Sequence, residues 1–164
     1  MQRRLLAILA GFFFMAAPAA AEAPATGSMA DGNLFYLDNG QKLAVEDLKG
    51  MVVVVTYWAA DCTPCDDQVK LVDHFARNMK DVGLVPLLVS VDTAPAAEVR
   101  AAARGTRLFP VRSVKGWLGP MNAAPTTYVI DRRGKVRYAG TGVMTLAALN
   151  EVLLPVIREP QPPM

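Results

Sequence analysis

The apolar positions of this chain form two uninterrupted runs with a helical pattern between them. Residues 51–58, MVVVVTYW, are almost entirely β-branched or aromatic, which is typical of a central strand covered on both faces. Residues 84–92, LVPLLVSVD, are a second buried run, and Pro86 favours the beginning of that strand or a bulge. Apolar residues at helical spacing predict a helix over residues 62–80. Its expected core positions are Val69, Val72, Phe75, Ala76 and Met79.

Shorter patterns flank this central unit. LFYL at 34–37 predicts a strand followed by a turn at DNGQK, and AAEVRAAAR at 96–104 predicts a helix that ends at Gly105. TTYVID at 126–131 and KVRYAG at 135–140 are separated by RRG and predict an antiparallel hairpin. A closing helix follows, with expected core positions Leu146, Leu149, Leu153 and Val156. This order of elements predicts an α/β fold with a central mixed β-sheet flanked by helices.

The amino-terminal residues have the organisation of a secretory signal. MQRR precedes an apolar run from Leu5 to Ala17, and small residues follow it. A bilayer span needs roughly 20 apolar residues, so residues 1–21 are predicted to be a cleaved signal peptide, with an uncleaved anchor as the alternative. A cut after Ala21 suits the A-x-A pattern, as do cuts after Ala19 and Ala23. We therefore expect an exported, periplasmic protein, in a compartment where disulfides persist.

Loss of the signal changes the charge of the chain. Arg3 and Arg4 leave with it, so 15 of the 17 basic residues remain against 15 acidic ones. A nearly neutral protein has no basic stripe for nucleic acid. The chain also lacks the G-x-G-x-x-G, P-loop and G-x-S-x-G motifs. We expect a flexible spacer at 22–33, one domain at 34–157 and a disordered tail at 158–164.

The only two cysteines, Cys62 and Cys65, form a C-x-x-C motif at the predicted start of a helix. The unpaired N–H groups and the positive end of the helix dipole favour a thiolate at Cys62. Pro64 suits the opening turn, and Cys65 lies one turn further, within reach to close a disulfide. We expect Cys62, nearer the loop, to exchange with a substrate sulfur and Cys65, buried beneath it, to resolve the mixed disulfide.

Other uses of the cysteine pair are less consistent with the residues. A structural disulfide gains stability from a long enclosed loop, and this loop is very short. A zinc site needs about four ligands, yet the only histidine, His74, lies nine residues past Cys65, about 13 Å along the helix. A copper(I) chaperone that uses Cys62 and Cys65 stays an alternative, because thiolates suit this soft ion.

Two stretches, VVTYWAADCTPC and NAAPTTYVIDRRGKV, resemble the signature regions of the thioredoxin superfamily. The resemblance is greatest to the exported TlpA, ResA and CcmG group of thiol-disulfide oxidoreductases and covers residues 34–157. It implies a thioredoxin-like fold with a central αβ insertion between Asp92 and Met121, in which we expect Trp117 to be a core residue. It also implies no cofactor other than the redox-active disulfide of Cys62 and Cys65.

The resemblance further implies a substrate-binding turn. The proline that matches Pro125 is cis in that family and lies against the disulfide, and the backbone beside it pairs with the substrate chain. Ala124, Pro125 and Thr126 are therefore the expected substrate-binding residues. From the sequence alone, a trans proline that opens a strand is the expectation, since most X-Pro bonds are trans.

Three residues near the cysteines depart from the family pattern. Relatives commonly carry tryptophan in place of Asp61, an acid or amide in place of Thr56, and glutamate in place of Gln68. The usual proton acceptor for the buried cysteine is therefore missing, and Asp61 either replaces it or tunes the local charge. Together with Pro64, these residues are the expected tuning positions of the pair.

Acidic residues surround the motif and decide the expected direction of electron flow. Asp61, Asp66 and Asp67 lie beside the cysteines, although acids at a helix start are also ordinary capping residues. No histidine or lysine lies between the cysteines to stabilise a thiolate, so we expect a reducing couple. The resemblance implies a membrane electron donor of the DsbD or CcdA type, and apocytochromes c or copper-site assembly proteins as substrates. A disulfide-donating oxidase or an isomerase of the same fold is the alternative.

Overall fold

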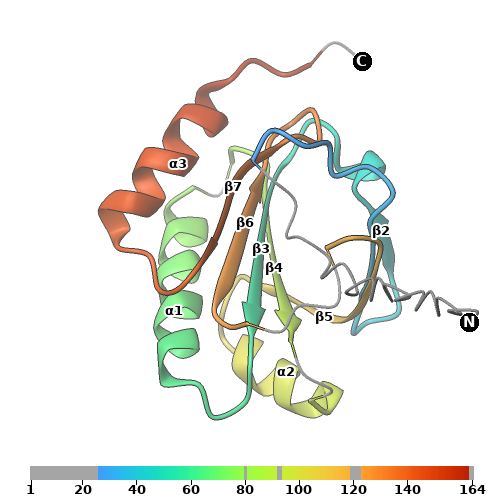
Figure 1. Cartoon of the computed structure of the whole chain (residues 1–164), viewed down its shortest axis with the longest axis vertical. Coiled ribbons are helices and arrows are strands. Elements are labelled where there is room, and N and C mark those ends of the chain that lie inside the picture. Colours follow the sequence, from blue (N-terminus) through green and yellow to red (C-terminus); the bar gives the residue numbers. More distant parts are fainter. Residues whose placement is uncertain (1–25, 80, 92–93, 119–122, 163–164) are drawn as a thin grey trace, which may run out of the picture.

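The computed structural model describes residues 26–79, 81–91, 94–118 and 123–162, so the predicted signal peptide lies outside the described residues. In the described part, a seven-stranded sheet is combined with three α-helices and one 3-10 helix (Figure 1). The elements are β1 (Leu34–Leu37), β2 (Lys42–Ala44), η1 (Glu46–Leu48), β3 (Val52–Trp58), α1 (Thr63–Asn78), β4 (Leu84–Ser90), α2 (Ala96–Ala103), β5 (Phe109–Lys115), β6 (Thr126–Ile130), β7 (Val136–Thr141) and α3 (Leu146–Arg158). The predicted α/β class and mixed sheet are confirmed.

The sheet has the strand order β2-β1-β5-β4-β3-β6-β7. β4 is parallel to both β3 and β5, whereas the other neighbouring pairs are antiparallel. α1 and α2 connect the parallel strands in the same direction across the sheet, so right-handed crossovers place both helices on one face. α2 and β5 form the predicted αβ element after Asp92. Pro86 lies near the beginning of β4, before the pairing with β5 starts at Leu87.

The buried strand β3 separates two hydrophobic cores. Val53, Val55 and Tyr57 point into a core that the N-terminal segment and η1 cover, and the half-buried Trp117 packs against it. Val54 and Trp58 point into the opposite core, which the three α-helices cover. Figure 1 shows α1 and α3 together on one side of the sheet. The expected strand at 51–58, covered on both faces, is confirmed from Val52 onward.

The predicted flexible spacer is wrong for its described part, which packs on the domain. The Gly27 N–H donates to the Val136 carbonyl at 2.7 Å, and the Val136 N–H donates to the Ser28 carbonyl at 2.8 Å. Asn33 is completely buried: its Nδ2 donates to the Ala30 carbonyl at 2.9 Å, and its Oδ1 accepts from the Leu118 N–H at 2.8 Å. Isolated small and polar residues carry no periodic signal, so the sequence pattern missed this attachment.

Three smaller differences concern the ends of elements. The chain after the predicted turn at DNGQK forms β2, which pairs with β1, and then η1. Leu146 is 45% exposed because it is the first residue of α3, whereas the other predicted core positions of that helix are buried. The predicted disordered tail is wrong at its start, since α3 includes Arg158 and the Glu159 carboxylate pairs with Arg137.

Tyr57 supplies a test of the core opposite the helices. Its hydroxyl is buried without a hydrogen-bond partner among the described residues, and burial, followed by the nearby Tyr128, raises the pKa of Tyr57. The unfolded state therefore ionises first, so this tyrosine stabilises the fold below about pH 10 and its contribution is lost as the pH rises further. We expect Tyr57→Phe to change the free energy of unfolding at pH 7 by less than about 1 kcal/mol. Urea unfolding of Tyr57→Phe between pH 7 and 11 should show a smaller loss of unfolding free energy at alkaline pH than wild type shows. A larger loss in the variant would contradict the raised pKa of Tyr57.

Candidate functional site

The two cysteines form a disulfide at the amino terminus of α1. Their sulfur atoms are 2.03 Å apart and their Cα atoms 5.2 Å apart. Cys62 is the N-cap residue of the helix: its Sγ lies 3.2 Å from the Cys65 nitrogen, and its carbonyl accepts from the Cys65 N–H at 2.9 Å. Pro64 occupies the first turn, where it has no intrahelical hydrogen bond to lose. The local geometry therefore places a sulfur at the positive end of a helix dipole.

The two sulfurs differ in their access to solvent. Cys62 is half-buried, whereas Cys65 is completely buried in the core beneath the helices. Cys62 is therefore the more accessible of the two cysteines. This is the arrangement predicted from the sequence, with one cysteine at the loop and the other below it.

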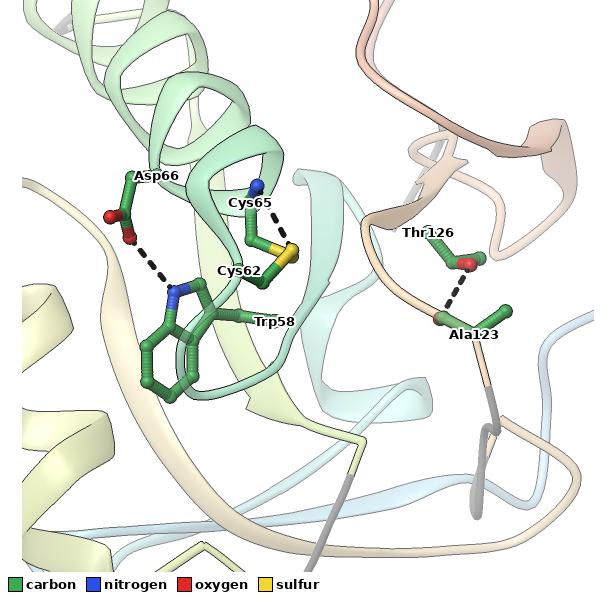
Figure 2. Close-up of a disulfide and its surroundings, with 6 residues drawn as sticks. All are labelled: Trp58, Cys62, Cys65, Asp66, Ala123 and Thr126. Carbon is green, nitrogen blue, oxygen red and sulfur yellow. Dashed lines mark hydrogen bonds between the residues drawn. A yellow bond between two sulfur atoms is a disulfide. The ribbon is translucent and has the colours of Figure 1, made fainter.

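The acidic residues around the motif have different surroundings. Asp61 is exposed and adopts φ 54°, a left-handed conformation that aspartate tolerates better than most residues. Its position on the surface disfavours the hypothesis that it replaces a buried proton acceptor. The Asp66 carboxylate accepts a hydrogen bond from the Trp58 indole Nε1 at 3.1 Å (Figure 2). Asp67 forms an exposed ion pair with Lys70.

A turn before β6 faces the disulfide from the other side. The Ala124–Pro125 peptide bond is cis, so the trans expectation from the residues alone is wrong and the expectation from the resemblance is confirmed. The Thr126 hydroxyl donates to the Ala123 carbonyl at 2.9 Å, and the Gly142 N–H donates to the Pro125 carbonyl at 2.8 Å. Figure 2 shows this turn across the disulfide from Trp58 and Asp66.

A buried amide fastens α1 to two distant segments. Gln68 is completely buried; its Nε2 donates to Thr127 Oγ1 at 3.2 Å, and its Oε1 accepts from the Met144 N–H at 2.8 Å. Thr56, opposite Thr127 in the sheet, is also completely buried. The expected tuning residues Thr56 and Gln68 thus lie in one layer between the sheet and α1. Sequence reasoning missed Thr127 and Met144 as the partners of Gln68, and the Trp58 indole as the partner of Asp66.

Neither a cluster of metal ligands nor a spanning helix occurs in the part of the chain that the structure describes. No group of three or more His, Cys, Asp and Glu side chains is arranged to hold an ion there. His74 is exposed on α1, with its Nε2 3.2 Å from Asn78 Nδ2. Among the described helices, none combines the length and apolar composition needed to cross a bilayer.

The sheet, the C-x-x-C disulfide at the start of α1 and the cis-proline turn opposite it define a thioredoxin-like thiol-disulfide oxidoreductase. Residues 26–139 match the AhpC/TSA family, and the chain belongs to that family. It is 30% identical over 121 residues to the thioredoxin-like protein YneN of Bacillus subtilis, which covers 70% of this chain and 71% of YneN. It is 26% identical over 154 residues to the thiol-disulfide oxidoreductase ResA of the same species, covering 91% of this chain and 86% of ResA.

Solved structures show the same fold. The Chlorobium tepidum protein described as a thiol:disulfide interchange protein DsbE superposes with a TM-score of 0.66 at 22% identity, covering 81% of this chain and 98% of that one. This likeness concerns the fold of the domain. The predicted thioredoxin-like architecture is confirmed.

Proposed function

We propose that this protein is exported and reduces disulfides in other exported proteins. The observation that carries the proposal is the half-exposed Cys62 at the helix start above the completely buried Cys65. The Cys62 thiolate attacks a substrate disulfide, which forms a mixed disulfide and releases one substrate thiolate. The Cys65 thiolate then attacks the Cys62 sulfur, which closes the Cys62–Cys65 disulfide and releases the second substrate thiolate. Two electrons pass from the protein to the substrate.

The cis-proline turn supplies the surface on which the substrate chain docks in this proposal. Pro125 has no N–H, so its backbone nitrogen leaves no unpaired donor against a docked sulfur. Ala124 is half-buried and packs against the same core as the disulfide, and the Thr126 hydroxyl holds the turn through Ala123. We assign substrate binding to Ala124, Pro125 and Thr126.

The charges near Cys62 support the proposed reducing direction. The helix terminus stabilises a thiolate, whereas exposed acids oppose it. Asp61 and Asp67 are such exposed acids. The residues between the cysteines are Thr63 and Pro64, and neither carries a positive charge. A strong oxidant depends on a stabilised thiolate in its reduced form. The charged side chains near Cys62 do not stabilise such a thiolate.

The proposed reaction needs a source of electrons and a class of substrate. After each cycle the Cys62–Cys65 disulfide has to be reduced by a dithiol donor, for which we propose a membrane protein of the DsbD or CcdA type. Apocytochromes c and copper-site assembly proteins are the proposed substrates. The cysteine pair itself is the redox group, and the proposal includes no other cofactor.

The redox equilibrium of the domain tests the proposed direction. The mature domain is equilibrated in glutathione or dithiothreitol buffers, and free thiols are trapped with a mass tag. We expect a potential near that of thioredoxin, about −270 mV. A potential near that of DsbA, about −120 mV, would contradict the reducing role and favour disulfide donation. Copper(I) titration of wild type and a Cys62→Ser/Cys65→Ser double variant tests the alternative of a copper(I) chaperone. Equal copper(I) binding by the two proteins would rule that alternative out.

A further inference from the structure

Thr56 carries a buried hydroxyl that none of the described residues satisfies in the disulfide form. The side chain is completely buried in the central strand β3, and its Oγ1 has no hydrogen-bond partner among the described residues. Buried polar groups in folded proteins are almost always hydrogen-bonded, so such an exception calls for an explanation. The redox chemistry of the neighbouring cysteines offers one.

The strand geometry places this hydroxyl in the layer beneath the disulfide. Side chains alternate along β3, so Thr56 shares its face with Val54 and Trp58. Both of these residues belong to the core that contains Cys65. The pairing of β3 with β6 also places Thr56 in this layer. Thr127 lies opposite Thr56 and accepts a hydrogen bond from Gln68, which follows Cys65 by three residues in α1.

Gln68, the other expected tuning residue of this layer, already has hydrogen-bond partners. The Gln68 amide uses its nitrogen on Thr127 Oγ1 and its oxygen on the Met144 N–H. Its bonds hold α1 against β6 and the segment after β7. Thr56, in contrast, has no partner among the described residues and is free to take a new one.

Reduction creates such a partner. A dithiol reductant delivers two electrons to the disulfide, the S–S bond breaks, and Cys65 is left as a buried thiol or thiolate. A hydroxyl can accept a hydrogen bond from S–H and donate one to S⁻. It suits both forms without titrating, so no proton moves to or from Thr56.

We propose that Thr56 is a positioning residue that hydrogen-bonds the Cys65 sulfur in the dithiol form and thereby stabilises the reduced protein. This inference rests on the proposed dithiol-disulfide function and assigns to the expected tuning residue Thr56 the contact through which it sets the potential. The unpaired hydroxyl disfavours the oxidised form, and the hydrogen bond favours the reduced form. Both effects shift the equilibrium in the same direction.

The test compares Thr56→Val, which keeps the shape and removes the hydroxyl, with Thr56→Ser, which keeps the hydroxyl. Both variants and wild type are equilibrated at one pH in glutathione or dithiothreitol buffers. We expect the equilibrium constant for reduction to fall about 3- to 10-fold in Thr56→Val, equivalent to a potential about 15–30 mV more negative. Thr56→Ser should stay near wild type. The oxidised form of Thr56→Val should unfold at the wild-type temperature or above it, because the variant loses an unpaired polar group.

Each other outcome overturns the inference. An unchanged potential in Thr56→Val, with wild type exchanging normally, removes the role of Thr56 and leaves the proposed function intact. An equal shift in both variants overturns the assignment to the hydroxyl, because Thr56→Ser keeps it. A wild-type pair that does not exchange at all overturns the inference together with the proposed function. Thr56→Ala carries the same comparison if Thr56→Val does not fold.

Discussion

Replacing Cys62 with serine is expected to abolish catalysis by this protein of the reduction of insulin disulfides, with dithiothreitol as the electron donor. The serine hydroxyl is not a nucleophile toward sulfur at neutral pH, and the remaining Cys65 is completely buried. The rate should fall to that of dithiothreitol alone. The measurement is the onset of insulin precipitation at a fixed protein concentration.

Two matched variants make this prediction specific. Cys65→Ser keeps the accessible sulfur and loses the resolving one, so it should accumulate a mixed disulfide with the substrate that a reductant releases. Thr63→Ala changes an exposed residue between the cysteines and should retain activity. Activity retained in Cys62→Ser, or a mixed disulfide formed through Cys65, would reverse the proposed roles.

Gln68→Ala is expected to lower the free energy of unfolding by about 3 kcal/mol. The substitution removes both hydrogen bonds of the buried amide, leaves the Met144 N–H without its acceptor and opens a cavity beneath the first turns of α1. The loss should appear as a lower urea midpoint with an unchanged slope.

Control substitutions separate the hydrogen bonds from the size of the side chain. Gln68→Met fills most of the space but leaves the Met144 N–H unpaired, so it should lose an intermediate amount of stability. Lys70→Ala, on the exposed face of the same helix, should change the free energy of unfolding by less than about 0.5 kcal/mol. A Gln68→Ala variant as stable as Lys70→Ala would show that the amide does not hold α1 to the sheet.

The periodic part of the fold was predictable from the sequence. The central strands and α1 have strong patterns because each buries a continuous run or stripe of apolar side chains. β2 and the attachment of residues 27–33 were not predicted. They depend on backbone hydrogen bonds and on single buried residues such as Asn33, which leave no period in the sequence.

The candidate site divides in the same way. Cys62, Pro64 and Cys65 lie within one turn of a helix, so their arrangement follows from local geometry. The hydrogen bonds of Gln68 join residues 59 and 76 positions apart in the chain. No local pattern contains that information. The cis bond at Pro125 was expected through a resemblance to a family, since the residues alone favoured trans.

The sequence by itself determined the α/β class, the helix that begins at the cysteines and the pair as the chemically reactive group, because periodicity and helix-end electrostatics are local. The tertiary structure decided that Asp66 bonds the Trp58 indole and that Asp61 stays on the surface. It also decided that Thr56, in the layer that contains Cys65, has no hydrogen-bond partner among the described residues. These hydrogen bonds and exposures depend on how segments distant in the sequence pack together, so local sequence patterns do not determine them.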